Sequence, residues 1–304
     1  MPGMTADDLQ HRFGIPETAG FETGSGGLVR LRLATPAAKA EVYLHGGHVT
    51  HYQPRGSGPV LFTSAQSRFD AKAAIRGGVP VIFPWFGPRA DDASAPVHGF
   101  ARTAEWDVES VARQADGGVL VVLRLDASDA TRSAWPHPFV LRHRITVGAA
   151  LDLALVVDNP SAEPLVFEEA LHTYLAVGDV REVSVTGLGG TTYIDKTDGM
   201  RRKPQGGEPL RLTAETDRVY LGTRAACVVD DPAGGRRLVV DKAGSETTVV
   251  WNPWAAKAHA MADLGGEEWL RMLCVETANA ADDRVTLPPG ARHEMRAVIR
   301  AESR

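Results

Sequence analysis

One histidine stands inside a run that otherwise has the pattern of a β-strand, in the stretch EEALHTYLAV at residues 168–177. Side chains alternate between the two faces of a strand, so over 164–177 His172 points away from the face that carries the leucines. The second face is small and polar, as a binding surface would be, and an imidazole there could transfer protons. The alternative is a core histidine whose ring nitrogens are satisfied by hydrogen bonds.

A carboxylate repeats this pattern in RMLCVETAN, residues 271–279. Leu273 and Val275 share one face of the predicted strand, and Glu276 lies on the other face. Partial desolvation raises the pKa of a lone carboxyl group toward the range useful for a general base. The alternative is a surface glutamate at a strand end.

The segment IRGGVPVIFPWFG, residues 75–87, is the least regular part of the sequence. Its two prolines block interior strand pairing and predict a rigid edge, and Gly77 and Gly78 would let the backbone approach a ligand. Arg76 could bind a phosphate through two parallel hydrogen bonds, while Trp85 and Phe86 could form an apolar wall against a sugar ring. A packed loop with an exposed arginine is the alternative.

Two further segments contain candidate binding residues. VHGFAR, residues 97–102, supplies His98 and Arg102. ETDRVY, residues 215–220, places Asp217 beside Arg218, where an ordinary surface ion pair is the simpler interpretation.

Metal and nucleotide cofactors are not expected. The three histidines of HGGHVTH, residues 45–51, would point to opposite faces of a strand and converge poorly on one ion. No glycine-rich phosphate-binding pattern follows a strand. Cys227 and Cys274 lack a paired spacing and lie in apolar surroundings, which favours buried free thiols.

Composition narrows the class of protein. Of the 304 residues, 43% are hydrophobic and 23% charged, and no apolar run is long enough to suggest a membrane span. The N-terminal residues do not resemble a secretory signal, so a cytoplasmic location is expected. A net charge of −5, without a basic tract, disfavours nucleic acid as a partner.

Strand patterns recur along the chain, for example in LVRLRLA (28–34) and LDLALVVDN (151–159), with turn signals between them. They predict an all-β protein, a single large antiparallel β-sandwich domain over residues 1–304. Residues 1–20 are expected to be a helical appendage, with Thr5 as N-cap and Gly14 at the helix end. The polar stretch 194–209 is predicted to be a mobile surface loop.

Together these segments resemble the D-hexose-6-phosphate mutarotases, also called glucose-6-phosphate 1-epimerases, within the wider aldose 1-epimerase group. The matching pieces occur in order across most of the chain: QHRFGIP, GGL, LHGGHVTHYQP, VLFTS, IRGGVPVIFPWFG, HGFAR, WPHPF, EEALHTYLAV, ETDRVY, VVWNPW and MLCVETAN. The resemblance implies a galactose-mutarotase-like supersandwich with few short helices.

The resemblance also implies roles for individual residues. His172 and Glu276 would flank the anomeric centre of a sugar as its acid and base. His98 and Asp217 would contact sugar hydroxyls, and arginines near the pocket, Arg76 and Arg102, would hold a phosphate.

The implied activity is interconversion of the α and β anomers of a hexose 6-phosphate, D-glucose 6-phosphate above all, by a monomer without a cofactor. Ionised Glu276 would take the anomeric proton and protonated His172 would protonate the ring oxygen, with modest upward pKa shifts expected for both. Two alternatives stay open. One is a mutarotase of free hexoses, and the other is a non-catalytic carbohydrate-binding β-sandwich that uses aromatic walls such as Trp85 and Trp254.

Overall fold

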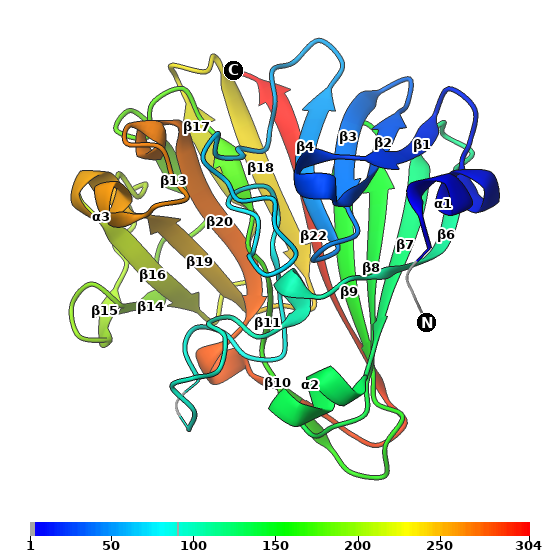
Figure 1. The fold of residues 1–304 in the computed structure, drawn as a ribbon. Helices are drawn as coiled ribbons and strands as arrows, with labels where there is room; N and C mark the ends of the chain where they lie inside the picture. Colours follow the sequence, from blue (N-terminus) through cyan, green and yellow to red (C-terminus); the bar gives the residue numbers. More distant parts are fainter. Residues whose placement is uncertain (1–3, 90) are drawn as a thin grey trace.

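Two eight-stranded antiparallel sheets face each other across one apolar core in the computed structural model, which describes residues 4–89 and 91–304 (Figure 1). A four-stranded sheet and a two-stranded sheet complete the architecture. The fold is the large antiparallel β-sandwich that the sequence predicts.

The first large sheet carries the candidate site. Its strand order is β15-β14-β16-β19-β20-β11-β5, and β12 also pairs with β20. The strands are β5 (Val81–Ile82), β11 (Glu169–Leu171), β12 (Tyr174–Ala176), β14 (Thr192–Asp195), β15 (Arg201–Pro204), β16 (Thr216–Leu221), β19 (Thr247–Asn252) and β20 (Met272–Asn279).

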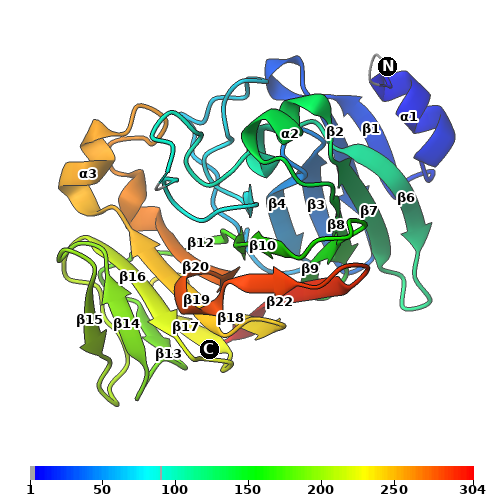
Figure 2. The ribbon, with the colours of Figure 1, turned by 90° about the horizontal axis from the view of Figure 1, so that it is seen from below.

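The second large sheet closes the other side of the core, in the order β13-β17-β18-β22-β9-β8-β7-β6 (Figure 2). Its strands are β6 (Asp107–Arg113), β7 (Val119–Asp126), β8 (Val140–Val147), β9 (Leu151–Asp158), β13 (Ser184–Thr186), β17 (Cys227–Asp231), β18 (Arg236–Ala243) and β22 (Arg292–Ser303).

Smaller elements flank the two sheets. The remaining strands are β1 (Ala19–Thr23), β2 (Val29–Ala34), β3 (Ala38–Tyr43) and β4 (His48–Pro54) in one sheet, and β10 (Leu165–Phe167) with β21 (Val285–Leu287) in the other. The α-helices are α1 (Ala6–Phe13), α2 (Asp129–Ala134) and α3 (Trp254–Ala260), and single 3₁₀ turns span Ser25–Gly27, Ala101–Thr103, Glu268–Arg271 and Ala281–Asp283.

The N-terminal helix is present where the sequence predicts it. Thr5 caps α1 by accepting a hydrogen bond from the Asp8 amide, Asp8 bonds back to the Thr5 amide, and Gly14 ends the helix. Leu9 is buried in the main core, although β1 already begins within the predicted appendage, at Ala19. Because one core cluster extends from Leu9 to Ile299, we infer that the chain forms a single domain.

Strand β20 is buried along its whole length and lies at the centre of the first sheet. Leu273 and Val275 point into the core between the sheets, while Met272 and Cys274 belong to a separate cluster on the opposite face. Glu276 shares that opposite face by alternation, as predicted. Figure 1 shows the irregular segment that precedes the 3₁₀ turn Ala101–Thr103, drawn in cyan, passing in front of β20 and β11.

The strand predicted over 164–177 is divided into three short pieces, β10, β11 and β12. His172 and Thr173 lie in the break between β11 and β12, where the His172 amide donates to the Pro80 carbonyl (3.0 Å) and the Val275 amide donates to the Thr173 carbonyl (3.1 Å). Leu171 and Leu175 still pack in the main core. The predicted division of faces therefore holds, although the strand is not continuous.

The prediction of a mobile loop over 194–209 is wrong for residues 194–195 and 201–204, which belong to two strands. Residues 192–195 form β14, which pairs with β15 on one side and with β16 on the other. The polar residues that suggested a loop lie on β15, an exposed edge strand, where polar side chains are usual.

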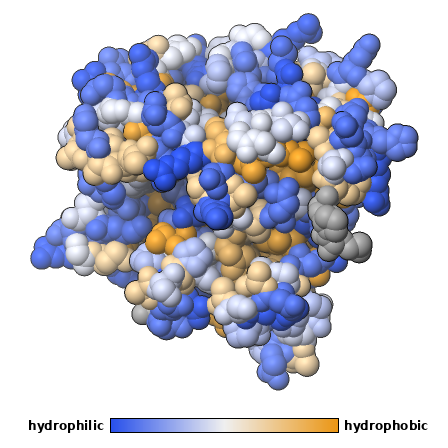
Figure 3. Space-filling model, viewed as in Figure 1, coloured by the Kyte–Doolittle hydropathy of each residue, from blue (hydrophilic) through white to orange (hydrophobic). Residues whose placement is uncertain are grey.

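Hydrophilic residues cover most of the face seen in Figure 3, and apolar residues form patches near its centre. Across the described residues, the large hydrophobic side chains that are well exposed are scattered singly, namely Met4, Val97, Val166 and Met200. None of the described helices has the length and apolar character needed to cross a membrane.

A buried ion pair joins the two large sheets. The Glu169 carboxyl group is fully buried on β11, and one of its oxygens lies 3.1 Å from His293 Nε2 on β22. Burial raises the pKa of Glu169. Burial alone would lower the pKa of His293, but the neighbouring Glu169 raises it overall.

Because both pKa values are raised, the folded protein binds more protons at this pair than the unfolded chain. We expect the pair's contribution to the free energy of unfolding to fall as pH rises from the ordinary glutamate value of 4.5 through the two raised values. Denaturant titrations from about pH 5 to about pH 9 should show that Glu169→Gln flattens this dependence by up to about 1.4 kcal/mol per pH unit. Glu182→Gln, at an exposed position, is the matched control, and an unchanged slope in Glu169→Gln would contradict the assignment.

Candidate active site

His172 and Glu276 meet on the face of the first sheet that is turned away from the main core. The Nε2 atom of His172 lies 3.3 Å from Oε1 of Glu276, and the two side chains are 10% and 1% exposed. Strand register brings them together, because Tyr174 pairs with Cys274 on one side of the break and Leu171 pairs with Thr277 on the other. The same register places His172 directly opposite Glu276, on the same face of the sheet.

The surroundings move the two pKa values in opposite directions. Burial lowers the pKa of His172 well below its usual value, and the nearby groups His98, Arg76 and Arg102 lower it further. Burial raises the pKa of Glu276 well above its usual value, with a further increase from Asp217 and a partial offset from Lys196. The expected upward shift is therefore present for the glutamate, whereas the direction expected for the histidine is wrong.

Aromatic rings fix the orientation of the His172 imidazole. Tyr174 stacks on it, with ring centroids 4.8 Å apart and planes 12° apart, and Trp251 meets it edge-on at 6.0 Å. The Tyr174 hydroxyl accepts a hydrogen bond from Nη1 of Arg76 (2.9 Å). The imidazole thus has a fixed face beside Glu276, as proton transfer between positioned groups requires.

His98 lies next to this pair in a constrained conformation. Its backbone has a φ of 68°, and its ring meets the His172 ring edge-on at 5.8 Å. The Gly87 amide donates to His98 Nδ1 (3.1 Å), so the ring proton of the neutral form is on Nε2. Burial and the charges of Arg102, Lys196 and Arg76 lower the pKa of His98 to about 3. A neutral histidine held this way presents one N–H donor.

The two candidate arginines differ in their partners. Arg76 donates to Asp263 through Nε and Nη2, at 3.1 and 3.0 Å, in addition to its bond with Tyr174. Arg102 donates to the Val97 carbonyl, and no carboxylate lies within ion-pair distance of it in residues 4–89 and 91–304. Burial lowers the pKa of Arg102, which indicates a guanidinium group poorly compensated by its surroundings.

Lys196 is a site residue that the sequence analysis missed. Its Nζ lies 3.2 Å from Asp217 Oδ2 and 5.5 Å from the centre of the Phe86 ring. Asp217 is therefore paired with Lys196 and not with its neighbour Arg218, whose guanidinium group lies over the Tyr193 ring. Burial raises the pKa of Asp217, and Lys196 opposes this effect. The alternating run TYID, which continues into Lys196, was the signal that could have revealed a strand ending at the site.

The aromatic surroundings differ in part from expectation. Trp85 is buried in the main core, and its indole N–H donates to the Pro96 carbonyl (2.9 Å). Phe86, in contrast, meets the His98 ring edge-on at 4.9 Å. The rings packed around the two histidines therefore come from Phe86, Tyr174 and Trp251.

The two glycines after Arg76 do not bring the backbone to a ligand. Both have positive φ angles, and they lie against neighbouring chain segments. A Cβ atom would lie 2.4 Å from the Phe62 carbonyl oxygen at Gly77 and 2.2 Å from the Val49 carbonyl oxygen at Gly78. Their role is close packing that places Arg76.

The three histidines of residues 45–51 do not gather around one point. His45 and His48 bind different backbone carbonyls, those of Ala73 and Gly77. Both cysteines are free and buried, as predicted.

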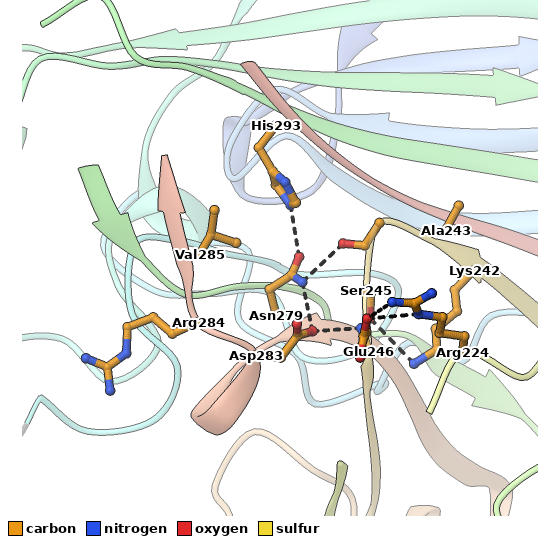
Figure 4. Close-up of a pocket in the computed structure, with 11 residues that line it drawn as sticks. Arg224, Lys242, Ala243, Ser245, Glu246, Asn279, Asp283, Arg284, Val285 and His293 are labelled. Atoms are coloured by element: carbon orange, nitrogen blue, oxygen red, sulfur yellow. Dashed lines mark hydrogen bonds and ion pairs between the residues drawn. The ribbon is translucent and has the colours of Figure 1, made fainter. Parts of the chain in front are cut away.

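A cavity of about 360 Å³ lies beyond the C-terminal end of β20 (Figure 4). Several of its polar and charged groups already have partners. Arg224 forms an ion pair with Glu246, Asp283 accepts from the Asn279 side chain (2.8 Å), and Lys242 donates to Thr248 (2.8 Å). Neither His172 nor Glu276 lines this cavity, so it is separate from the candidate active site.

Comparisons with known proteins agree with the geometry. The sequence pattern of the family described as "Aldose 1-epimerase" matches residues 29–300. Two proteins named "Putative glucose-6-phosphate 1-epimerase" are similar to the chain. The one from Cenchrus ciliaris is 35% identical over 272 residues, covering 86% of this chain and 81% of its own, and the one from Escherichia coli K12 is 37% identical, covering 81% and 82%.

The same relationship is seen among solved structures. A Salmonella typhimurium protein described as "a putative mutarotase (YeaD)" superposes with a TM-score of 0.89 at 30% identity, with 96% of each chain covered. A "galactose mutarotase-like protein" from Clostridium acetobutylicum shares the fold at a TM-score of 0.72. The chain belongs to the aldose 1-epimerase family.

Proposed function

We propose that the protein interconverts the α and β anomers of a hexose 6-phosphate, with D-glucose 6-phosphate as its substrate. One observation carries this proposal: the buried His172–Glu276 pair lies beside Arg102, a cation with no carboxylate partner among the described residues. A proton donor and acceptor suit a hemiacetal, and an uncompensated guanidinium group suits a phosphate. The names of the similar plant and bacterial proteins point to the same substrate.

The reaction moves protons and opens and recloses one bond. Glu276 takes the proton from the anomeric hydroxyl while His172, protonated, donates one to the ring oxygen, so the C1–O5 bond breaks and C1 becomes an aldehyde. Rotation about C1–C2 then presents the other face of the aldehyde. On closure, O5 returns its proton to His172 and Glu276 returns its proton to O1, which restores the enzyme.

The substrate's phosphate supplies a reason for His172 to act as an acid. In the free protein, burial and the charges of His98, Arg76 and Arg102 disfavour the imidazolium form. A phosphate monoester carries about −1.5 to −2 charges at pH 7 and would offset the arginines. Its binding would therefore raise the pKa of His172 just when protonation is needed.

The other polar groups have positioning roles in this proposal. His98 would donate its Nε2–H to a sugar hydroxyl, and Asp217, held by Lys196, would accept from another. Phe86 and Trp251 would pack against the sugar, in place of Trp85. No residue of the proposed mechanism requires a cofactor. A monomeric enzyme in the cytoplasm remains the expectation from the sequence.

Two alternatives make different demands on the site. A mutarotase of free hexoses would use the same acid and base but would not need a cation without a carboxylate partner. A carbohydrate-binding protein would not need a proton donor and acceptor 3.3 Å apart. As a member of the aldose 1-epimerase family the protein is an isomerase, which disfavours the second alternative.

Replacing either proton carrier should abolish anomer exchange without unfolding the protein. We expect His172→Asn and Glu276→Gln each to lower the exchange rate of glucose 6-phosphate by about 10²- to 10⁴-fold, because each removes one general acid or base. Magnetisation transfer between the two anomeric protons measures the rate directly. His11→Asn, at an exposed position on α1, is the matched control, and near-full exchange in either site variant would refute that residue's role.

Removing the guanidinium group of Arg102 should impair the reaction of the phosphorylated sugar more than that of the free sugar. We expect Arg102→Ala to lower kcat/KM for glucose 6-phosphate by about 10- to 100-fold, the loss of a charge-assisted hydrogen bond, and to change kcat/KM for glucose much less. Arg300→Ala, on β22 and paired with Glu302, serves as control. Equal losses for both sugars would exclude the phosphate contact and favour a free-hexose mutarotase.

A further inference from the structure

A third donor group stands beside the proton pair. Cys274 precedes Glu276 by two residues on β20, so both side chains share one face of the sheet. One ring nitrogen of His172, the Sγ of Cys274 and one carboxylate oxygen of Glu276 all lie within 4.8 Å of one another, and all three residues are buried. The proton transfers of the proposed reaction do not use this thiol. We refer to His172, Cys274 and Glu276 as the donor triad.

We propose that the donor triad is an inhibitory binding site for a borderline-soft divalent metal ion of the Zn²⁺ class. Imidazole, thiolate and carboxylate are the ligand types that zinc sites combine, and three protein ligands leave a fourth position open. Ligand atoms in a tetrahedral zinc site are about 3.5 Å apart, as the bond lengths of about 2.0 to 2.3 Å dictate. The 3.3 Å separation of His172 and Glu276 already meets this requirement.

Two further observations favour a cation at this point. Oε2 of Glu276 is buried without a hydrogen-bond partner within the described part of the chain, so this oxygen has unmatched lone pairs that a metal ion could satisfy. The rings of Tyr174 and Trp251 already hold the imidazole in place, which lowers the entropy lost on coordination.

Charge balance decides which ions fit. Three cationic side chains act on the two proton carriers, namely Arg76, Arg102 and Lys196, and they disfavour an added bare cation. Coordination releases the thiol proton, so a thiolate and a carboxylate together offset the two charges of the ion. A hard ion such as Mg²⁺ does not bind thiolate well and gains less from this site.

The consequence for activity is direct competition. A metal ion held by the donor triad occupies the ligand atoms of both proton carriers, which the hemiacetal must contact. Metal and sugar phosphate therefore exclude each other, and the proposed anomer exchange stops until the ion leaves. This inference goes beyond the proposed function, although its kinetic readout relies on it.

Zinc titrations of three forms of the protein test the site. Anomer exchange of glucose 6-phosphate is measured for wild type, Cys274→Ser and Cys227→Ser at rising ZnCl₂, with Mg²⁺ as the hard-ion control and a chelator added at the end. Cys227, buried on β17, provides the matched control for a lost thiol. We expect zinc to inhibit wild type and Cys227→Ser reversibly, and Cys274→Ser to require at least about tenfold more zinc. Equal zinc sensitivity in all three forms, or none in wild type, would overturn the proposal.

A direct readout separates this proposal from the proposed function. Co²⁺ added to the protein should produce a thiolate-to-cobalt charge-transfer absorption in wild type and Cys227→Ser but not in Cys274→Ser, and glucose 6-phosphate should diminish it. If this absorption forms while wild type shows no anomer exchange, the metal site stands and the enzyme proposal fails. If exchange is normal and no cysteine-dependent absorption forms, the metal site fails and the enzyme proposal stands.

Discussion

The pairing of β20 with the broken strand β11–β12 is the constraint on which the site depends. The residue pairs on the two sides of the break have the same register with β20. His172 therefore lies opposite Glu276, although His172 itself belongs to neither β11 nor β12. A slip of one residue would turn the histidine to the other face of the sheet and separate the two groups. The amide of His172 also bonds to the carbonyl of Pro80, which ties the break to the irregular segment that carries Arg76.

Burial gives this pair its chemical character. A carboxyl group and an imidazole in water would have pKa values about two units apart, with the carboxyl group ionised and the imidazole the more basic of the two. Inside the sheet, desolvation disfavours the charged form of each, and the surrounding cations add to the effect on the histidine. Both shifts therefore act against the difference in proton affinity that the two groups have in water. Smaller differences in proton affinity favour a reaction that runs in both directions, because each group must both accept and donate a proton during one cycle of ring opening and closure.

Local patterns in the sequence were sufficient for part of this structure. Alternation alone assigned His172 and Glu276 to faces away from the leucines, and the Thr5 and Gly14 signals located α1. These features depend on neighbours within a few residues. The large β-sandwich followed from the same alternation repeated along the chain.

Features that depend on distant contacts could not be read from the sequence. The downward pKa shift of His172 arises first from burial and then from His98 and two arginines in separate segments. The choice of Trp251 over Trp85 as a ring beside the histidine depends on how the core fills. The polar run near Lys196 resembled a loop because an exposed edge strand and a loop have the same composition. Only the pairing of β14 with β16 brings Lys196 to Asp217.

The left-handed backbone of His98 restricts how this pocket can change during evolution. Few side chains accept a φ of 68°, chiefly those of asparagine, aspartate and histidine besides glycine, while β-branched residues are excluded. The next residue, Gly99, is equally constrained, because a Cβ atom there would lie 2.0 Å from the Phe83 carbonyl oxygen. Few residues can therefore replace His98 if the sugar preference of the pocket is to change. Among these replacements, asparagine keeps an N–H donor.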